Sequence, residues 1–166
     1  MLYRQFCQGL ALLLGLFVAT AYADRTYNKP ELCAYACYDT ISALTFGDFD
    51  PTSEYITQRC NSRLAVSSMY ACFDLRCSAQ YTPEESFDYL EWYCEEYGPT
   101  TLNGTYADVI QDILTEFGSL DNIPVVDPTN FTDIVNTTVL TPQVNYDLSY
   151  KTLVSLFELC SQNYSR

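Results

Sequence analysis

The sequence predicts a mainly α-helical fold, a small disulfide-stapled helical bundle of about five helices with irregular glycosylated loops. Three observations favour this fold class. Apolar residues recur at helical spacing in several segments, six cysteines lie between Cys33 and Cys94, and four N-glycosylation sequons lie in the second half of the chain. Clustered cysteines in a short secreted chain are typical of a disulfide framework.

Residues 1–23 have the pattern of a secretory signal peptide. Arg4 supplies a basic start, "GLALLLGLFVA" is an apolar core too short to span a bilayer, and Ala21 and Ala23 are the small residues that signal peptidase reads. An N-terminal membrane anchor is the alternative interpretation. We expect the mature chain to have no membrane span and to be secreted or held at the extracellular face of the plasma membrane.

A cysteine-rich helical domain is expected over residues 24–97. Pro30 suits the first position of a helix and Gly47 suits its C-terminal stop. In a later helix Thr82 can act as the N-cap and Pro83 can occupy the first turn. The expected helices span residues 30–46, 62–75 and 82–97.

The rest of the chain, residues 98–166, is expected to be a Thr/Asn-rich glycosylated segment with two helices. The helices are expected over 105–118, where Gly118 is the stop, and over 146–160. The stretch between them contains three prolines and is expected to be extended or irregular. The four sequons, expected to be exposed and glycosylated, start at Asn103, Asn130, Asn136 and Asn163.

The cysteines are interpreted as structural disulfides rather than as metal ligands or an exchanging thiol pair. Cys33 and Cys37 are four residues apart inside a helix, whereas a redox pair is typically C-x-x-C at a helix N-terminus after a strand. Each would bond to a neighbouring segment, most simply the one that holds Cys72 and Cys77, and Cys60 could then join Cys94. The exact pairing stays open at this point, and Cys160 is left over. The six expected disulfide cysteines are Cys33, Cys37, Cys60, Cys72, Cys77 and Cys94.

The chain is strongly acidic, with a formal net charge of −13 at pH 7 that becomes one unit more negative when Arg4 is removed. Such a charge excludes the electrostatic footprint of a nucleic-acid-binding protein. Carboxylates also suit a hard cation such as ferric iron, although a solvated helix face is the simpler interpretation. The candidate metal ligands, one stripe of the helix at 82–97, are Glu84, Asp88, Glu91 and Glu95.

No catalytic apparatus is visible in the sequence. The chain has no histidine, which excludes Ser-His-Asp and Cys-His catalysis, imidazole-ligated haem and the usual zinc sites. It also has no Gly-rich phosphate loop, dinucleotide fingerprint or nucleophile elbow. From its residues alone the chain is predicted to be a secreted, acidic, non-enzymatic domain without catalytic residues.

Three cysteine-bearing motifs carry a family resemblance: "ELCAYACYDTISALTF", "CNSRLAVSSMYACFDLRC" and "YLEWYC". Together they resemble the N-terminal extracellular region of fungal ferric (metallo)reductases, a transmembrane family similar to NADPH oxidases. "NYDLSYKTLVSLFE" is similar to the juxtamembrane helix that leads into the first membrane span of that family. The resemblance covers residues 30–97 and 146–158.

In that family, histidine pairs in membrane helices hold haem, and a cytosolic domain binds FAD and NADPH. Electrons cross the membrane and reduce extracellular Fe(III) or Cu(II). Because this chain lacks these parts, the resemblance implies a non-catalytic ectodomain without cofactors of its own, involved in iron or copper acquisition. Its expected partners are the membrane part of a metalloreductase or metal ions.

The chain departs from the family at "LCSQNYSR", where a hydrophobic span should begin. We therefore expect an ectodomain cut from a larger protein, the product of a truncated gene, or a free-standing secreted relative. The alternative function is that of a free-standing secreted carrier or effector, whose helical disulfide scaffold binds an apolar ligand or a host protein.

Overall fold

The structure is a computed structural model that describes residues 29–77, 82–98, 101–102, 104–129 and 133–164. The expected signal peptide lies outside these residues. The described part is mainly α-helical and stapled by three disulfides, which confirms the predicted fold class. Its α-helices are α2 (Lys29–Ser42), α3 (Tyr55–Asn61), α4 (Arg63–Cys72), α5 (Pro83–Tyr97), α6 (Tyr106–Phe117) and α7 (Gln143–Tyr164). The shorter elements are a π-helical turn (Phe73–Cys77), a 3-10 turn (Leu120–Asn122), and the strands β1 (Thr45–Phe46) and β2 (Ile134–Val135).

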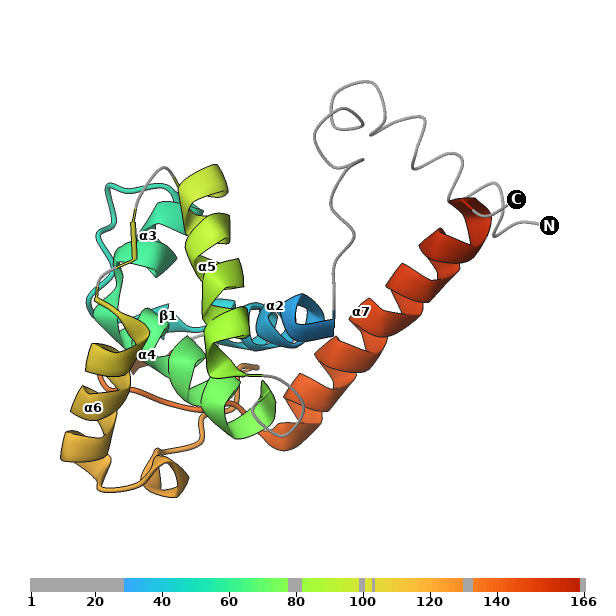
Figure 1. Ribbon diagram of the computed structural model, residues 1–166. Coiled ribbons are helices and arrows are strands. Elements are labelled where there is room, and N and C mark those ends of the chain that lie inside the picture. The colour runs from blue at the N-terminus through green and yellow to red at the C-terminus, as the bar shows by residue number, and fades with distance from the viewer. Residues whose placement is uncertain (1–28, 78–81, 99–100, 103, 130–132, 165–166) are drawn as a thin grey trace.

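Helix α2 lies at the centre of the bundle and packs against α4, α5 and α7 (Figure 1). Its inward face is built from compact side chains, and Ala34, Ala36, Cys37 and Ile41 are all fully buried. Compact side chains allow neighbouring helices to approach closely, so that aromatic side chains from α4 and α5 fill the remaining space. The largest buried side chains are Tyr70, Tyr89, Phe46 and Phe73.

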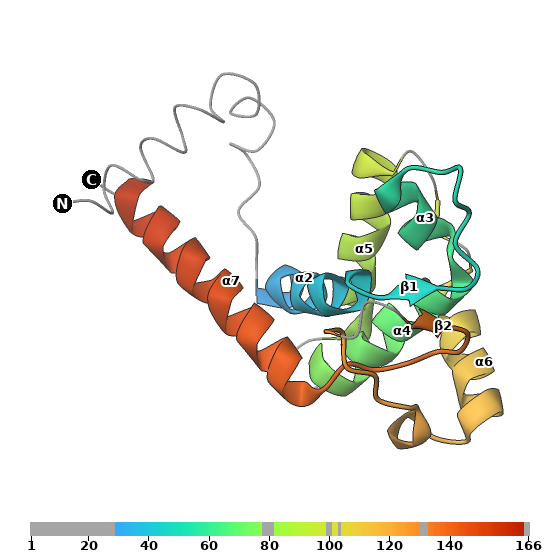
Figure 2. The same cartoon turned by 180° about the vertical axis from the view of Figure 1, so that it is seen from behind.

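The two halves distinguished in the sequence, residues 24–97 and 98–166, contribute to the same hydrophobic core. Strand β1 pairs in parallel with β2, and Phe46 lies opposite Val135. Helix α6 packs on α4, and α7 packs on α2 (Figures 1 and 2). The described parts of both halves therefore form one packed unit.

Helices α5 and α6 begin and end where the sequence predicts. Glu85 accepts a hydrogen bond from the backbone N–H of Thr82 at 3.0 Å, as in a capping box. The hydroxyl of Thr105 accepts from the backbone N–H of Asp108 at 3.3 Å. Gly118 ends α6 with a positive φ of 73°, a conformation that glycine adopts at little cost.

The first helix is shorter than predicted. The sequence indicates a helix over 30–46, but α2 ends at Ser42 and the chain turns into β1. Two interactions stop the helix: pairing of β1 with β2, and hydrogen bonds from the buried side chain of Arg59 to the Ser42 carbonyl. Both partners are remote in sequence, so the local pattern does not register them.

The second predicted helix, over 62–75, changes character at Cys72. Helix α4 ends there and continues as the π-helical turn to Cys77. In an α-helix these two cysteines would be about 140° apart, whereas the wider i to i+5 spacing of a π turn places both toward α2. The departure from α-helix thus allows both cysteines to bond to one neighbouring helix.

Helix α3 is an addition to the predicted elements. Its seven residues cover too few turns for a periodic pattern, and Glu54 at its N-cap makes no side-chain capping hydrogen bond. The described part has six α-helices where about five were expected.

Helix α7 is longer than the predicted 146–160. It starts against α2 and then extends away from the rest of the bundle, as both views show (Figures 1 and 2). In the part of the chain that the structure describes, no helix, α7 included, combines the length and the apolar character that crossing a membrane requires.

Candidate functional site between α2 and α7

Three disulfides hold the helices around α2. Cys33 bonds to Cys77 and Cys37 to Cys72, so that two bridges join α2 to α4 and its π-helical turn. A third bridge, from Cys60 to Cys94, joins α3 to α5. The Cα atoms of the three pairs are 5.9, 5.9 and 5.8 Å apart, within the usual disulfide range.

The sulfur atoms of these bridges are buried, and none of them is a free thiol. Cys33 and Cys37 stack on one face of α2 and are 2% and 0% exposed. As disulfides they supply neither a thiolate nucleophile nor a thiolate metal ligand. The two cysteines act as anchors for the neighbouring segment. The backbone of Cys160 lies in α7, but its side chain is outside the described residues.

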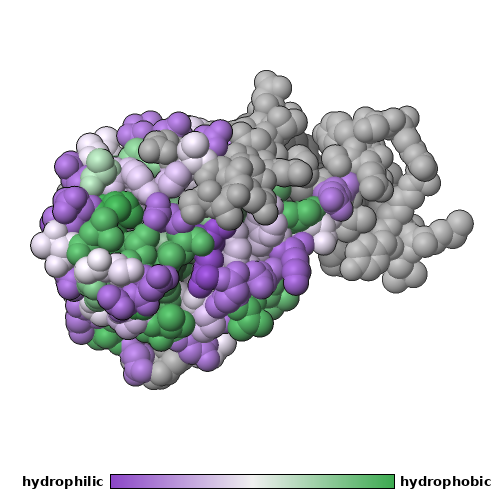
Figure 3. Space-filling model, turned by 60° about the horizontal axis from the view of Figure 1, so that its bottom comes forward, coloured by the Kyte–Doolittle hydropathy of each residue, from purple (hydrophilic) through white to green (hydrophobic). Residues whose placement is uncertain are grey.

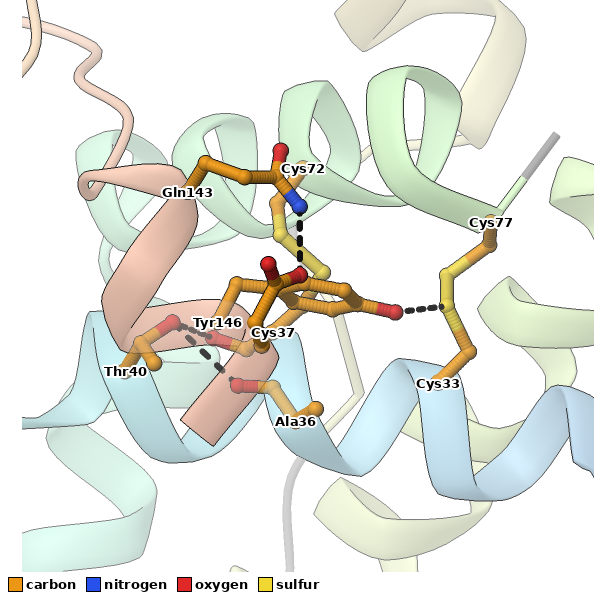
Figure 4. Close-up of a disulfide and its surroundings, with 9 residues drawn as sticks. Cys33, Ala36, Cys37, Thr40, Cys72, Cys77, Gln143 and Tyr146 are labelled. Atoms are coloured by element: carbon orange, nitrogen blue, oxygen red, sulfur yellow. Dashed lines mark hydrogen bonds between the residues drawn. A yellow bond between two sulfur atoms is a disulfide. The ribbon is translucent and has the colours of Figure 1, made fainter. Parts of the chain in front are cut away.

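Helix α7 contacts the disulfide pair directly. The hydroxyl of Tyr146 lies 2.8 Å from the Sγ atom of Cys33, and its phenol points from α7 toward the bridge (Figure 4). Because a bridged sulfur carries no proton, the tyrosine hydroxyl is the donor. The Tyr146 ring also stacks on Tyr150, one helical turn further along, with 6.0 Å between the ring centroids.

A second polar contact lies further along the same seam. The hydroxyl of Ser149 donates to Oδ2 of Asp39 on α2 at 2.7 Å. The hydroxyl of Thr40, next in sequence, donates within α2 to the carbonyl oxygens of Ala36 and Cys37 at 3.2 and 3.1 Å. Together, the contacts of Tyr146 and Ser149 fix the first half of α7 on α2.

An open groove of about 580 Å³ lies along this seam, and we refer to it as the seam groove. Helix α2 forms one wall, α7 forms the other, and Pro128 and Thr129 contribute from the segment before β2. The principal lining side chains are Tyr35, Asp39, Ala43, Thr129, Leu148 and Leu153. The volume lies within the usual range for small-molecule sites, although the groove is open to solvent.

Aromatic side chains pack α2 against α5. Tyr38 lies 4.8 Å from Tyr93 and Tyr35 lies 6.3 Å from Tyr89, measured between ring centroids. Burial raises the pKa of Tyr38, and its hydrogen bond and charge interaction with Tyr93 raise it further. These contacts are core packing between the two helices.

Arg59 is a buried cation that the sequence does not single out. Its Nε and Nη2 atoms donate to the Ser42 carbonyl at 3.1 and 2.6 Å, and Nη1 donates to the Tyr55 carbonyl at 3.0 Å. The guanidinium also lies 3.3 Å from the centroid of the Tyr55 ring. Burial lowers the pKa of Arg59. The guanidinium lies at the C-terminal, negative end of α2, and the helix dipole therefore favours its positive charge. In the sequence, the i, i+4 spacing of Tyr55 and Arg59 is the signal that could have predicted their contact.

The acidic stripe stays a row of separate side chains on α5. Asp88, Glu91 and Glu95 are exposed, and the side chain of Glu84 lies outside the described residues. Among the residues that the structure describes, no group of three or more histidine, cysteine, aspartate or glutamate side chains lies together in a way that could hold a metal ion.

The structure describes the asparagine side chain of only one of the four sequons. Asn136 is exposed and directly follows β2. Asn103 and Asn130 lie outside the described residues, and Asn163 lies in α7 with its side chain outside them.

Comparison of the chain with protein-family models, with curated proteins and with solved structures found no match.

Proposed function

We propose that the chain is a non-catalytic extracellular domain that resembles a metalloreductase ectodomain and holds α7 in a fixed direction outside the membrane. The observation that carries the proposal is the fixation of α7. Its first turns bind α2 through Tyr146 and Ser149, while the rest of the helix extends away from the bundle. A helix fixed at one end in this way suits a connection between a folded domain and a partner.

The extracellular setting is supported by the covalent framework. Three disulfides and the absence of a membrane-spanning helix from the described part are compatible with an extracellular protein. The resemblance to metalloreductases rests on the cysteine motifs. From it we also propose that the partner is the membrane protein that carries haem, FAD and NADPH. In this arrangement the negative charge of the chain would attract metal cations toward the reductase.

A reduction assay tests this function. Cells that lack the chain should reduce extracellular Fe(III) or Cu(II) more slowly, and re-expression should restore the rate. The double variant Tyr146→Phe, Ser149→Ala removes the two polar contacts of α7 and should restore it only in part. The purified chain supplied with NADPH should produce no Fe(II). An unchanged rate in deleted cells, or Fe(III) reduction by the purified chain, would contradict the proposal.

The second candidate function, a secreted carrier or effector, is favoured by the seam groove. Its volume suits a small ligand, and Leu148 and Leu153 provide apolar surface in it. The two functions are separable because a carrier would bind its ligand without any membrane partner. Release of a co-purified small molecule on unfolding, detected by mass spectrometry, would favour the carrier.

A further inference from the structure

The seam groove combines an apolar wall with a single negative charge. Tyr35, Ala43, Leu148 and Leu153 present carbon surface, and Asp39 is the one side chain that is charged at neutral pH among the described residues that line the groove. No lysine or arginine belongs to this lining. A ligand that is apolar over most of its length and positively charged at one end would match this surface in both respects.

The carboxylate of Asp39 retains capacity to bind a donor. Its Oδ2 atom accepts from Ser149 at 2.7 Å, and no described residue donates to Oδ1. An ionised carboxylate has about four lone-pair positions, so the Ser149 bond leaves most of them available. The residue is exposed, so a ligand can approach it from solvent.

The adjoining segment carries a second negative charge, one residue before the lining residues of that segment. Asp127 precedes the lining residues Pro128 and Thr129, and its Oδ1 accepts from the backbone N–H and the hydroxyl of Thr129 at 2.9 and 2.8 Å. These hydrogen bonds hold the pKa of Asp127 below its ordinary value, and the carboxylate is ionised at neutral pH as an exposed aspartate is in general. With a net charge of −13 on the whole chain, the local and global fields both favour a cation.

Other surfaces of the chain combine apolar side chains and charge less clearly than the seam groove does. On the face shown in Figure 3, apolar side chains occur in patches separated by hydrophilic ones. Val144 and Leu148 are exposed on α7, but only Leu148 belongs to the lining of the seam groove beside a charged group. The groove is therefore the place where shape, apolar surface and charge coincide.

We propose that the seam groove is a binding site for small organic cations, in which a protonated amine contacts Asp39 and an apolar body lies along Leu148 and Leu153. This inference is independent of the metalloreductase proposal, because it concerns the groove and needs no membrane partner. Since the groove is open, the affinity for a ligand of about ten heavy atoms should be modest, with a Kd on the order of 1 mM.

The test uses three probes of matched size: phenethylamine, which is cationic, 2-phenylethanol, which is neutral, and phenylacetate, which is anionic. Methyl NMR spectra of the full mature chain are recorded at low salt during titration with each probe. Phenethylamine should shift the methyl signals of Ala43, Leu148 and Leu153 in a saturable way. 2-Phenylethanol should bind several-fold more weakly, and phenylacetate should not bind.

Variants separate a specific contact from general attraction. Asp39→Asn keeps an oxygen that can accept from Ser149 but removes the charge, and should weaken phenethylamine binding about two- to fivefold. Glu96→Gln makes the same charge change at an exposed position of α5 outside the groove and should leave binding unchanged. Leu148→Gln should also weaken binding; because Leu148 is 68% exposed, this substitution should leave the fold intact.

Three results would overturn the proposal. The first is equal affinity for phenethylamine and 2-phenylethanol. The second is equal weakening by Asp39→Asn and Glu96→Gln, which would indicate attraction by net charge alone. The third is a set of shifted methyl signals that excludes Ala43 and Leu148, which would place the bound amine elsewhere.

Discussion

Tyr70 provides a sharp test of the packing of α4, because its hydroxyl is buried without a hydrogen-bond partner among the described residues. The residue is 0% exposed, and its ring lies 5.1 Å from that of Phe87 and 5.6 Å from that of Tyr106, measured between centroids. Burial raises the pKa of Tyr70, and the negative charge of Glu91 raises it further. The substitution Tyr70→Phe keeps the ring and removes only the hydroxyl.

We expect Tyr70→Phe to increase the free energy of unfolding. A buried hydroxyl without a partner costs about 1–3 kcal/mol of lost hydration, and the substitution removes this cost while the aromatic contacts stay. We take the lower end of that range, about 1 kcal/mol, because a small rearrangement can bring a partner closer. For a domain of this size the corresponding rise in Tm is about 4 °C.

Tyr106→Phe is the matched comparison, because the same atom is removed from a neighbouring tyrosine that has a partner. The hydroxyl of Tyr106 donates to Oδ1 of Asp74 at 2.7 Å. Loss of a hydrogen bond to a charged acceptor should lower the free energy of unfolding by about 1–2 kcal/mol. The two substitutions therefore have opposite expected signs.

Urea unfolding followed by circular dichroism at pH 7, with the disulfides intact, measures both variants and the double variant. The rings of Tyr70 and Tyr106 touch, so their effects need not add. A decrease of 1 kcal/mol or more for Tyr70→Phe would refute the reasoning, since it would mean that the hydroxyl has a strong partner in the folded protein.

Three further predictions concern the framework. Arg59→Lys should lower the free energy of unfolding by about 2 kcal/mol, because lysine cannot reproduce the paired hydrogen bonds to the Ser42 carbonyl or the stacking on the Tyr55 ring. Arg63→Lys, at an exposed ion pair, is the control and should change the free energy of unfolding by less than about 0.5 kcal/mol in the same urea assay. Replacement of Cys60 and Cys94 by serine removes a bridge with a sequence separation of 34 and should lower the free energy of unfolding by about 4 kcal/mol. The urea midpoint should fall accordingly, and an unchanged midpoint would contradict a structural role for this bridge. Because burial raises the pKa of Tyr70 in the folded protein, the unfolded chain ionises first, and stability should fall as the pH rises above about 10. This alkaline loss of stability should be smaller in Tyr70→Phe, and an identical pH profile would exclude the linkage.

The helices with strong local end signals are those that the sequence predicts best. Helix α5 starts after Thr82, whose backbone N–H donates to the Glu85 carboxylate, and α6 runs from its Thr105 cap to Gly118. These signals act between residues that are at most a few positions apart, so they are visible in the sequence alone. The same holds for the placement of Cys33 and Cys37 on one helix face.

Elements that depend on remote partners are not visible in this way. The end of α2 depends on Arg59, and the seam groove depends on Asp39 meeting Ser149, which is 110 residues away. Tyr146 belongs to a predicted helix, but its hydroxyl meets a disulfide cysteine 113 residues away. Local periodicity describes which face a residue occupies and not what lies opposite that face.

The sequence by itself determined that this protein is an acidic, mainly helical domain with a clustered set of six cysteines, because composition and i, i+4 spacing are properties of the chain. The tertiary structure decided which cysteines pair, where α2 stops, and that α7 leaves the bundle beside a groove with one carboxylate. The physical reason is that these features are contacts between segments far apart in sequence. Such contacts depend on packing geometry, which no local pattern contains.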